Sequence, residues 1–140
     1  ANVIYSVWLD VIYDPLKDTT AGPNFGDTIG WAGQITADKL SAEILNTGEV
    51  KVYINFNTAA NPVVVPIPYF DGGVIINPLF VTGGILLSSN TGNASSFVDG
   101  SDKIQQYRYI LIPGGVNTLA TPDVDWNDYN SVKKYLNLKD

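Results

Sequence analysis

The chain contains no histidine, no cysteine and no methionine among its 140 residues. Without imidazole it has no Ser-His or Cys-His nucleophile and no histidine general base near neutral pH. It also offers no imidazole or thiolate ligand for zinc, copper or haem. We therefore predict no enzymatic activity, no catalytic residues, no metal site and no cofactor. Such a domain is better suited to holding or binding a partner than to transforming one.

Charge is scarce as well, and its balance is negative. Charged residues make up 16 % of the chain, the formal net charge is -6, and the eight basic residues are scattered. No basic patch is available for DNA, RNA or an anionic membrane, so we expect no nucleic-acid partner. No stretch approaches the roughly 18 apolar residues that a membrane span needs. At this length, with 45 % hydrophobic residues, we predict a single domain over residues 1–140.

What the chain has instead is short apolar runs separated by 13 glycines and eight prolines, a pattern typical of many short strands. The apolar series at odd positions of residues 3–13 predicts one long strand with a buried face. The following residues 14–33 are rich in Gly, Pro, Thr and Asp and predict a long loop, with Phe25, Ile29 and Trp31 packing back onto the core.

Two segments have helical periodicity. In residues 36–46, Leu40 and Ile44 are spaced i and i+4, with Thr36 as the expected N-cap and Gly48 as a left-handed C-terminal residue. The second predicted helix, in residues 124–136, is amphipathic and is expected to pack across a sheet end. Its N-cap is predicted to be Asp125 or Asn127, and its apolar face comprises Trp126, Tyr129, Val132 and Leu136.

The remaining runs predict strands and turns. Residues 63–70 are expected to form an edge strand because Pro66 and Pro68 remove two backbone donors on one side. Glycine turns then connect this strand to two more in a meander. The other predictions are strands over residues 50–56 (half-exposed), 74–81, 85–89 and 104–112, and a polar loop over 90–103. With no alternation of strands and helices, the fold class is all-β and mainly antiparallel: a β-sandwich or jelly roll with two short helices.

Two acidic segments resemble calcium-binding loops in part. Asp123, Asp125 and Asn127 alternate as calcium ligands do, but Lys134 occupies the position where a bidentate Glu is needed. Helix capping is the better interpretation. Turn chemistry likewise explains the acidic residues at 99–102.

Three residues are candidates for ligand binding: Trp31, Tyr107 and Arg108. Trp31 follows a glycine-rich stretch and could stack on a sugar ring, whereas Trp8 is expected to be buried. Arg108 is the only arginine and lies beside Tyr107, so it could stack on an aromatic ring or bind a carboxylate with its fork. The competing and favoured interpretation of Arg108 is a structural pair with a nearby Asp.

Four motifs in the chain have a distinctive order and spacing. They are A-N-V-I-Y-S-x-W at the start, P-Y-x-D-G at 68–72, Q-Y-R-Y-I-L-I-P-G-G at 106–115 and W-N-D-Y-x-x-V at 126–132. Together they resemble the globular C-terminal domain of collagen-like surface proteins of Bacteroidota. The resemblance covers essentially the whole chain. It implies an extracellular or outer-surface module without catalytic residues, preceded in that family by a Gly-X-Y stalk.

From this resemblance we expect a structural and interaction role. The β-sandwich domain would form the end of a collagen-like fibre, align its chains in register or hold them together as a trimer, and mediate adhesion. The expected partner is the chain itself, as a homotrimer or as filament neighbours, with a glycan or host-surface ligand as a further partner. Two alternatives stay open. One is a carbohydrate-binding module, and the other is a pilin-like filament subunit whose first strand completes a neighbour's sheet.

Overall fold

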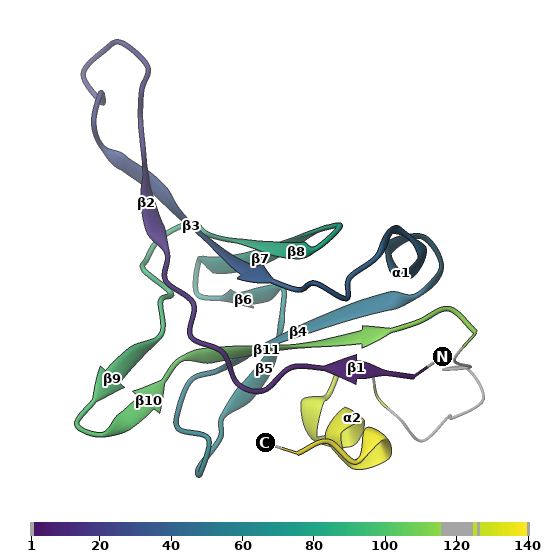
Figure 1. Cartoon of the computed structure of the whole chain (residues 1–140). Helices are drawn as coiled ribbons and strands as arrows, with labels where there is room; N and C mark the ends of the chain where they lie inside the picture. The colour runs from purple at the N-terminus through teal and green to yellow at the C-terminus, as the bar shows by residue number, and fades with distance from the viewer. Residues whose placement is uncertain (1, 116–124, 126, 140) are drawn as a thin grey trace.

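The computed structural model describes residues 2–115, 125 and 127–139. It is an all-β sandwich of two antiparallel sheets, as predicted (Figure 1). The four-stranded sheet has the order β1-β11-β4-β5 and the five-stranded sheet the order β2-β3-β8-β7-β6. The strands of the first sheet are β1 (Ile4–Tyr5), β11 (Gln106–Ile112), β4 (Glu49–Asn55) and β5 (Val64–Ile67). Those of the second are β2 (Asp14–Lys17), β3 (Thr28–Thr36), β8 (Gly84–Ser89), β7 (Val74–Val81) and β6 (Tyr69–Asp71).

Three smaller elements complete the fold. A separate hairpin joins β9 (Phe97–Asp99) to β10 (Asp102–Ile104), so the predicted polar loop over 90–103 contains two short strands. The helices are α1 (Ala42–Thr47) and α2 (Tyr129–Leu136). Figure 1 shows α2 against the four-stranded sheet, on the side away from the five-stranded sheet. The predicted meander is confirmed as β6, β7 and β8, which pair in sequence order.

The core lies between the two sheets, and a second cluster lies under α2. Alternate residues of β4 and β11 belong to different clusters. Val52 and Tyr107 pack in the core between the sheets, whereas Tyr53 and Ile110 pack in the cluster under α2. From Val52 to Asn55, strand β4 is therefore buried on both faces. The prediction of a half-exposed strand here was wrong, because Asn55 is fully buried and caps the following turn by accepting from the Asn57 and Val63 amides.

The prolines lie at a sheet edge, as predicted. Among the described strands, β5 pairs only with β4, so Pro66 needs no amide hydrogen for a ladder on its other side. However, the segment is two strands rather than one. Between Ile67 and Tyr69, at Pro68, the chain leaves the four-stranded sheet and enters the five-stranded sheet.

The prediction of one long strand over residues 3–13 was wrong. Only Ile4–Tyr5 pairs with β11, followed by a single bridge from Leu9 to Tyr107. The buried side chains are Trp8, Val11 and Tyr13, which do not alternate regularly. The segment bends because it starts beside one sheet and ends at the edge of the other.

Residues 14–33 are not the predicted loop. They contain β2 and most of β3, which form a hairpin that projects from the body of the molecule (Figure 1). Phe25 and Ile29 are 66 % and 62 % exposed, so neither packs onto the core. Trp31, closer to the body, is partly buried against it as predicted.

Both helices begin later than predicted. The N-cap of α1 is Ser41, whose hydroxyl accepts from the Ile44 amide, while Thr36 ends β3. Gly48 follows the helix with extended backbone, not left-handed. A Cβ there would collide with the Ile112 carbonyl oxygen, so close approach is what requires glycine.

In the second helix, Asp128 is the N-cap rather than Asp125 or Asn127, because its carboxylate accepts from the Asn130 amide. Tyr129 and Val132 are buried and Leu136 partly buried on the predicted face; Trp126 lies outside the described residues. The helix packs on the face of the four-stranded sheet rather than across its end. Lastly, the predicted strand 104–112 is interrupted at Gln105, whose φ is 63°.

Candidate functional site

The three predicted ligand-binding residues do not meet on one surface. Tyr107 and Arg108 are consecutive on β11, so their side chains point to opposite faces of the sheet. Both are 0 % exposed. The Tyr107 hydroxyl donates to the Ala94 carbonyl oxygen at 2.7 Å between the sheets, and Trp31 lies on β3 of the other sheet. Neither β11 residue is in a position to contact an outside ligand.

Arg108 instead connects both ends of the chain. Its Nε donates to the Ser6 carbonyl oxygen at 2.8 Å, and its terminal nitrogens donate to the Tyr129 hydroxyl and the Lys139 carbonyl oxygen. The guanidinium carbon lies 5.3 Å from the ring centre of Tyr5 and 5.6 Å from that of Trp8. The predicted aromatic stacking is thus present. These contacts form a clasp between the N-terminal segment, β11 and the C-terminal helix.

The buried tyrosines are held in their neutral form. Burial raises the pKa of Tyr13 to about 12, an effect partly offset by the neighbouring Tyr107 hydroxyl. Burial also raises the pKa of Tyr53 and of Tyr107 far above the ordinary range. These residues fill the interior and carry no charge under physiological conditions.

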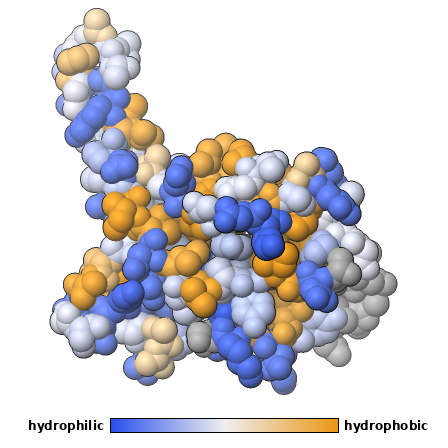
Figure 2. All heavy atoms as spheres, in the orientation of Figure 1, coloured by the Kyte–Doolittle hydropathy of each residue, from blue (hydrophilic) through white to orange (hydrophobic). Residues whose placement is uncertain are grey.

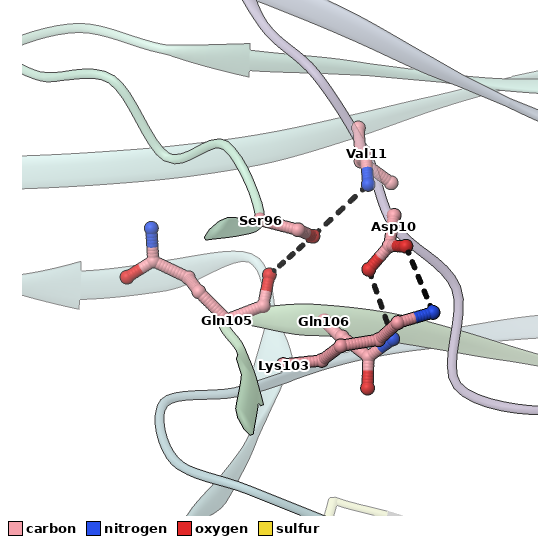
Figure 3. A network of polar contacts seen from close by, with 6 residues as sticks. All are labelled: Asp10, Val11, Ser96, Lys103, Gln105 and Gln106. Carbon is pink, nitrogen blue, oxygen red and sulfur yellow. Dashed lines mark hydrogen bonds and ion pairs between the residues drawn. The ribbon is translucent and has the colours of Figure 1, made fainter. Parts of the chain in front are cut away.

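A polar network fixes the bend of the N-terminal segment (Figure 3). The Asp10 carboxylate accepts from Gln106 Nε2 at 2.9 Å and lies 3.5 Å from Lys103 Nζ. The Ser96 hydroxyl accepts from the Val11 amide and donates to the Gln105 carbonyl oxygen. These contacts tie residues 10 and 11 to the start of β11, and we assign them a structural role.

The acidic segments form turns in the described parts of the chain. Asp125 accepts from the Asn127 amide at 2.9 Å, which is turn chemistry rather than ion binding, while Asp123 lies outside the described residues. Asp99 and Asp102 pair across the β9–β10 hairpin, with Gly100 at a φ of 66° in its turn. Over residues 2–115, 125 and 127–139, no group of three or more acidic side chains is arranged to hold a metal ion.

Exposed apolar side chains lie on the outer face of the five-stranded sheet, here called the open face. Register places Leu79 beside Leu86, and Leu86 beside Gln34, across three strands. A hollow of about 590 Å³ continues this row past Leu86 to Ile12 and Leu16. The exposed fractions are 61 % for Leu79, 39 % for Leu86, 65 % for Ile12 and 46 % for Leu16. No described helix covers this face.

The open face is continuous with the projecting hairpin. Leu16 of β2, which pairs with Gly30, extends the open face onto the base of the hairpin. Ile29 lies on the other side of β3, the side of Ile35, and Phe25 lies in the loop at the tip. Figure 2 shows hydrophobic residues gathered at the base of the hairpin and above β7 and β8. A monomeric soluble protein rarely exposes a large contiguous apolar patch unless the patch is functional.

Sequence reasoning did not identify the open face, although a signal was present. The runs Leu79–Val81 and Ile85–Leu87 have three consecutive apolar residues, which put apolar side chains on both faces of a strand. Two-sided runs indicate a strand that is covered on both sides. Here the inner face is covered by the other sheet, while the outer face of β7 and β8 is exposed.

Comparison of the chain with protein-family models, with curated proteins and with solved structures found no significant match. No helix among the described residues is long and apolar enough to cross a membrane.

Proposed function

We propose that this domain is the non-enzymatic interaction head of an extracellular collagen-like fibre, and that it joins copies of itself into a homotrimer at the outer cell surface. The observation that carries the proposal is the open face with its projecting hairpin. Apolar side chains on this face, including Leu79 and Leu86, are exposed, although the interior of the domain is closely packed. A second copy that covers this face would remove that surface from water.

The sheet edges favour contact through the face rather than through strand addition. Strand β1 has two paired residues, β6 has three, and β5 carries Pro66. Strand β2 carries Pro15 and a register shift between Leu16 and Lys17. Short strands, prolines and bulges are the features that block pairing with another chain. They weigh against the pilin-like alternative, as does the use of the first strand within its own sheet.

The N-terminal segment is anchored as a stalk junction requires. Strand β1 pairs with β11, the Ser6 hydroxyl accepts from the Tyr109 amide at 3.0 Å, and Arg108 binds the Ser6 carbonyl oxygen. Force on a stalk attached before β1 would therefore be transmitted to β11, an inner strand of the four-stranded sheet. This anchoring supports the attachment of a stalk at the N-terminal segment.

Sedimentation equilibrium of the protein together with its natural upstream segment tests the proposal. We expect a trimer, and we expect Leu79→Lys to weaken association at least tenfold because it places a charge on the open face. Val98→Lys is the matched control: Val98 is 64 % exposed, also on a strand, but lies on the β9–β10 hairpin. A monomeric wild type would reject the proposal. Equal weakening by both variants would reject the open face as the interface.

A further inference from the structure

A second hollow lies at one end of the sandwich, apart from the open face. Its volume is about 260 Å³, and it is bounded by the end of β4, the β6–β7 hairpin and the loop that follows β8. Its accessible lining is mostly apolar, and none of its lining residues is charged. Ligand sites typically combine such an apolar lining with a few fixed polar groups.

The apolar side of the hollow is aromatic. Phe56 and Tyr69 lie with ring centres 5.1 Å apart in an edge-to-face arrangement, above Ile76 of the core. The Tyr69 hydroxyl donates to the Asp71 carboxylate at 3.1 Å, and this hydrogen bond raises the pKa of Tyr69. The ring is therefore both neutral and fixed in place. Aromatic surfaces of this kind pack against the apolar face of a sugar ring.

The polar side presents a donor and an acceptor from two carboxamides. Asn93 Oδ1 accepts from both the amide and the hydroxyl of Ser95, which leaves its Nδ2 group to donate to a ligand. Gln105 Nε2 donates to the Ser95 carbonyl oxygen at 2.9 Å, which leaves its Oε1 to accept. Thr91 adds an exposed hydroxyl to the same lining.

The backbone of Gln105 explains how its carboxamide reaches this site. Its φ of 63° lies in the left-handed region, which is uncommon for a residue other than glycine. Its carbonyl oxygen is held by Ser96, while its side chain extends away from that contact (Figure 3). A conformation of this kind, held by its surroundings, is a feature of positioned binding residues.

We propose that this hollow binds one neutral sugar residue, with the ring against Phe56 and Tyr69 and its hydroxyls paired with Asn93, Gln105 and Thr91. The absence of charge from the lining residues favours a neutral sugar over a sialic or uronic acid. The volume suits a single ring rather than a chain, so the dissociation constant for one residue is expected to be about 1 mM. This hollow shares no lining residue with the hollow on the open face.

Nuclear magnetic resonance titration of the ¹⁵N-labelled protein with methyl glycosides of glucose, galactose, mannose and N-acetylglucosamine tests the proposal. We expect at least one to shift the amides of residues 91–94 and the Gln105 side-chain amide, and glucuronic acid to shift neither. Saturation of the shifts gives the dissociation constant.

The decisive variant is Asn93→Asp, which keeps an oxygen to accept from Ser95 but removes the Nδ2 donor. Binding should weaken at least tenfold, whereas Asn24→Asp, the same change in the exposed hairpin loop, should leave it unchanged. The spectrum of each variant shows directly whether it is folded. The proposal is overturned if no neutral glycoside shifts residues 91–94 at concentrations up to about 50 mM, a large excess over the expected constant. Shifts centred on Trp31, or equal binding by Asn93→Asp, would overturn it as well.

Discussion

The two sheets of the sandwich have similar strands but different outer faces. On the four-stranded sheet, Tyr53, Arg108 and Ile110 are fully buried beneath α2 and the chain termini. On the five-stranded sheet, Leu79 and Leu86 occupy equivalent outward positions and remain 61 % and 39 % exposed. The difference follows from where α2 packs: the helix covers the four-stranded sheet and leaves the outer face of the five-stranded sheet exposed.

The sharpest test of the covered face is Arg108→Ala. The substitution removes a fully buried side chain together with its hydrogen bonds to Ser6, Tyr129 and Lys139, and it opens a cavity. We expect a loss of about 4 kcal/mol in the free energy of unfolding, measured by urea denaturation. Lys103→Ala removes an exposed ion pair to Asp10 and should cost less than about 1 kcal/mol. Equal effects of the two variants would show that the clasp does not hold the termini.

Alanine substitutions of two neighbouring residues on β8 compare the inner and outer faces of the five-stranded sheet directly. Ile85 is 0 % exposed and Leu86 is 39 % exposed. Ile85→Ala should destabilise the monomer by about 3 kcal/mol because it leaves a cavity between the sheets, whereas Leu86→Ala should cost less than about 1 kcal/mol. Urea denaturation under conditions where the protein is monomeric measures both. A large loss for Leu86→Ala would mean that the open face is already covered within one copy.

High pH should unfold the domain through its buried tyrosines. The folded-state pKa of Tyr13, about 12, lies above the usual 10.0, so its contribution to stability is fully present below pH 10 and is lost as the pH rises through 12. For Tyr13 alone this contribution is about 3 kcal/mol. Tyr53 and Tyr107 act in the same direction. Absorbance of tyrosinate at high pH should rise together with the loss of β-sheet circular dichroism.

In urea-unfolded protein, by contrast, the tyrosines should titrate together near the usual pKa. If the folded protein gave the same titration curve, the buried tyrosines would have to be accessible to solvent.

A smaller loss is expected at the cap of α2 than in the core or at Arg108. Asp128→Ala removes the carboxylate that accepts from the Asn130 amide and should cost about 1 kcal/mol. Asp128→Asn keeps a capping oxygen and should recover most of the loss. Thermal unfolding followed by circular dichroism compares the two variants with the wild type. Equal losses would show that the charge of Asp128, rather than its capping bond, stabilises the helix.

The fold class followed from local patterns. Glycine turns and apolar runs predicted the β6-β7-β8 meander, and Pro66 predicted an edge strand. The buried face of α2, with Tyr129 and Val132, followed from helical spacing. Two of the errors fell where the chain changes sheet. Residues 3–13 were predicted as one strand and Pro68 was placed within another because periodicity gives no information on which sheet a strand joins.

The sites were less predictable than the fold. Arg108 and Tyr107 were singled out for their chemistry, yet the structure buries both, because β11 lies in the middle of a sheet that is covered on each side. The hollow beside Phe56 and Tyr69 joins residues from separate parts of the chain, and no local spacing marks it.

The sequence by itself determined an all-β, antiparallel chain without histidine or thiol chemistry, because turn residues and side-chain periodicity act between near neighbours. Only the tertiary structure decided that α2 covers one sheet and leaves the other open. It also decided that Arg108 holds both termini and that Asn93 and Gln105 meet beside two aromatic rings. These arrangements depend on contacts between residues far apart in sequence, whose geometry is set when the two sheets pack together.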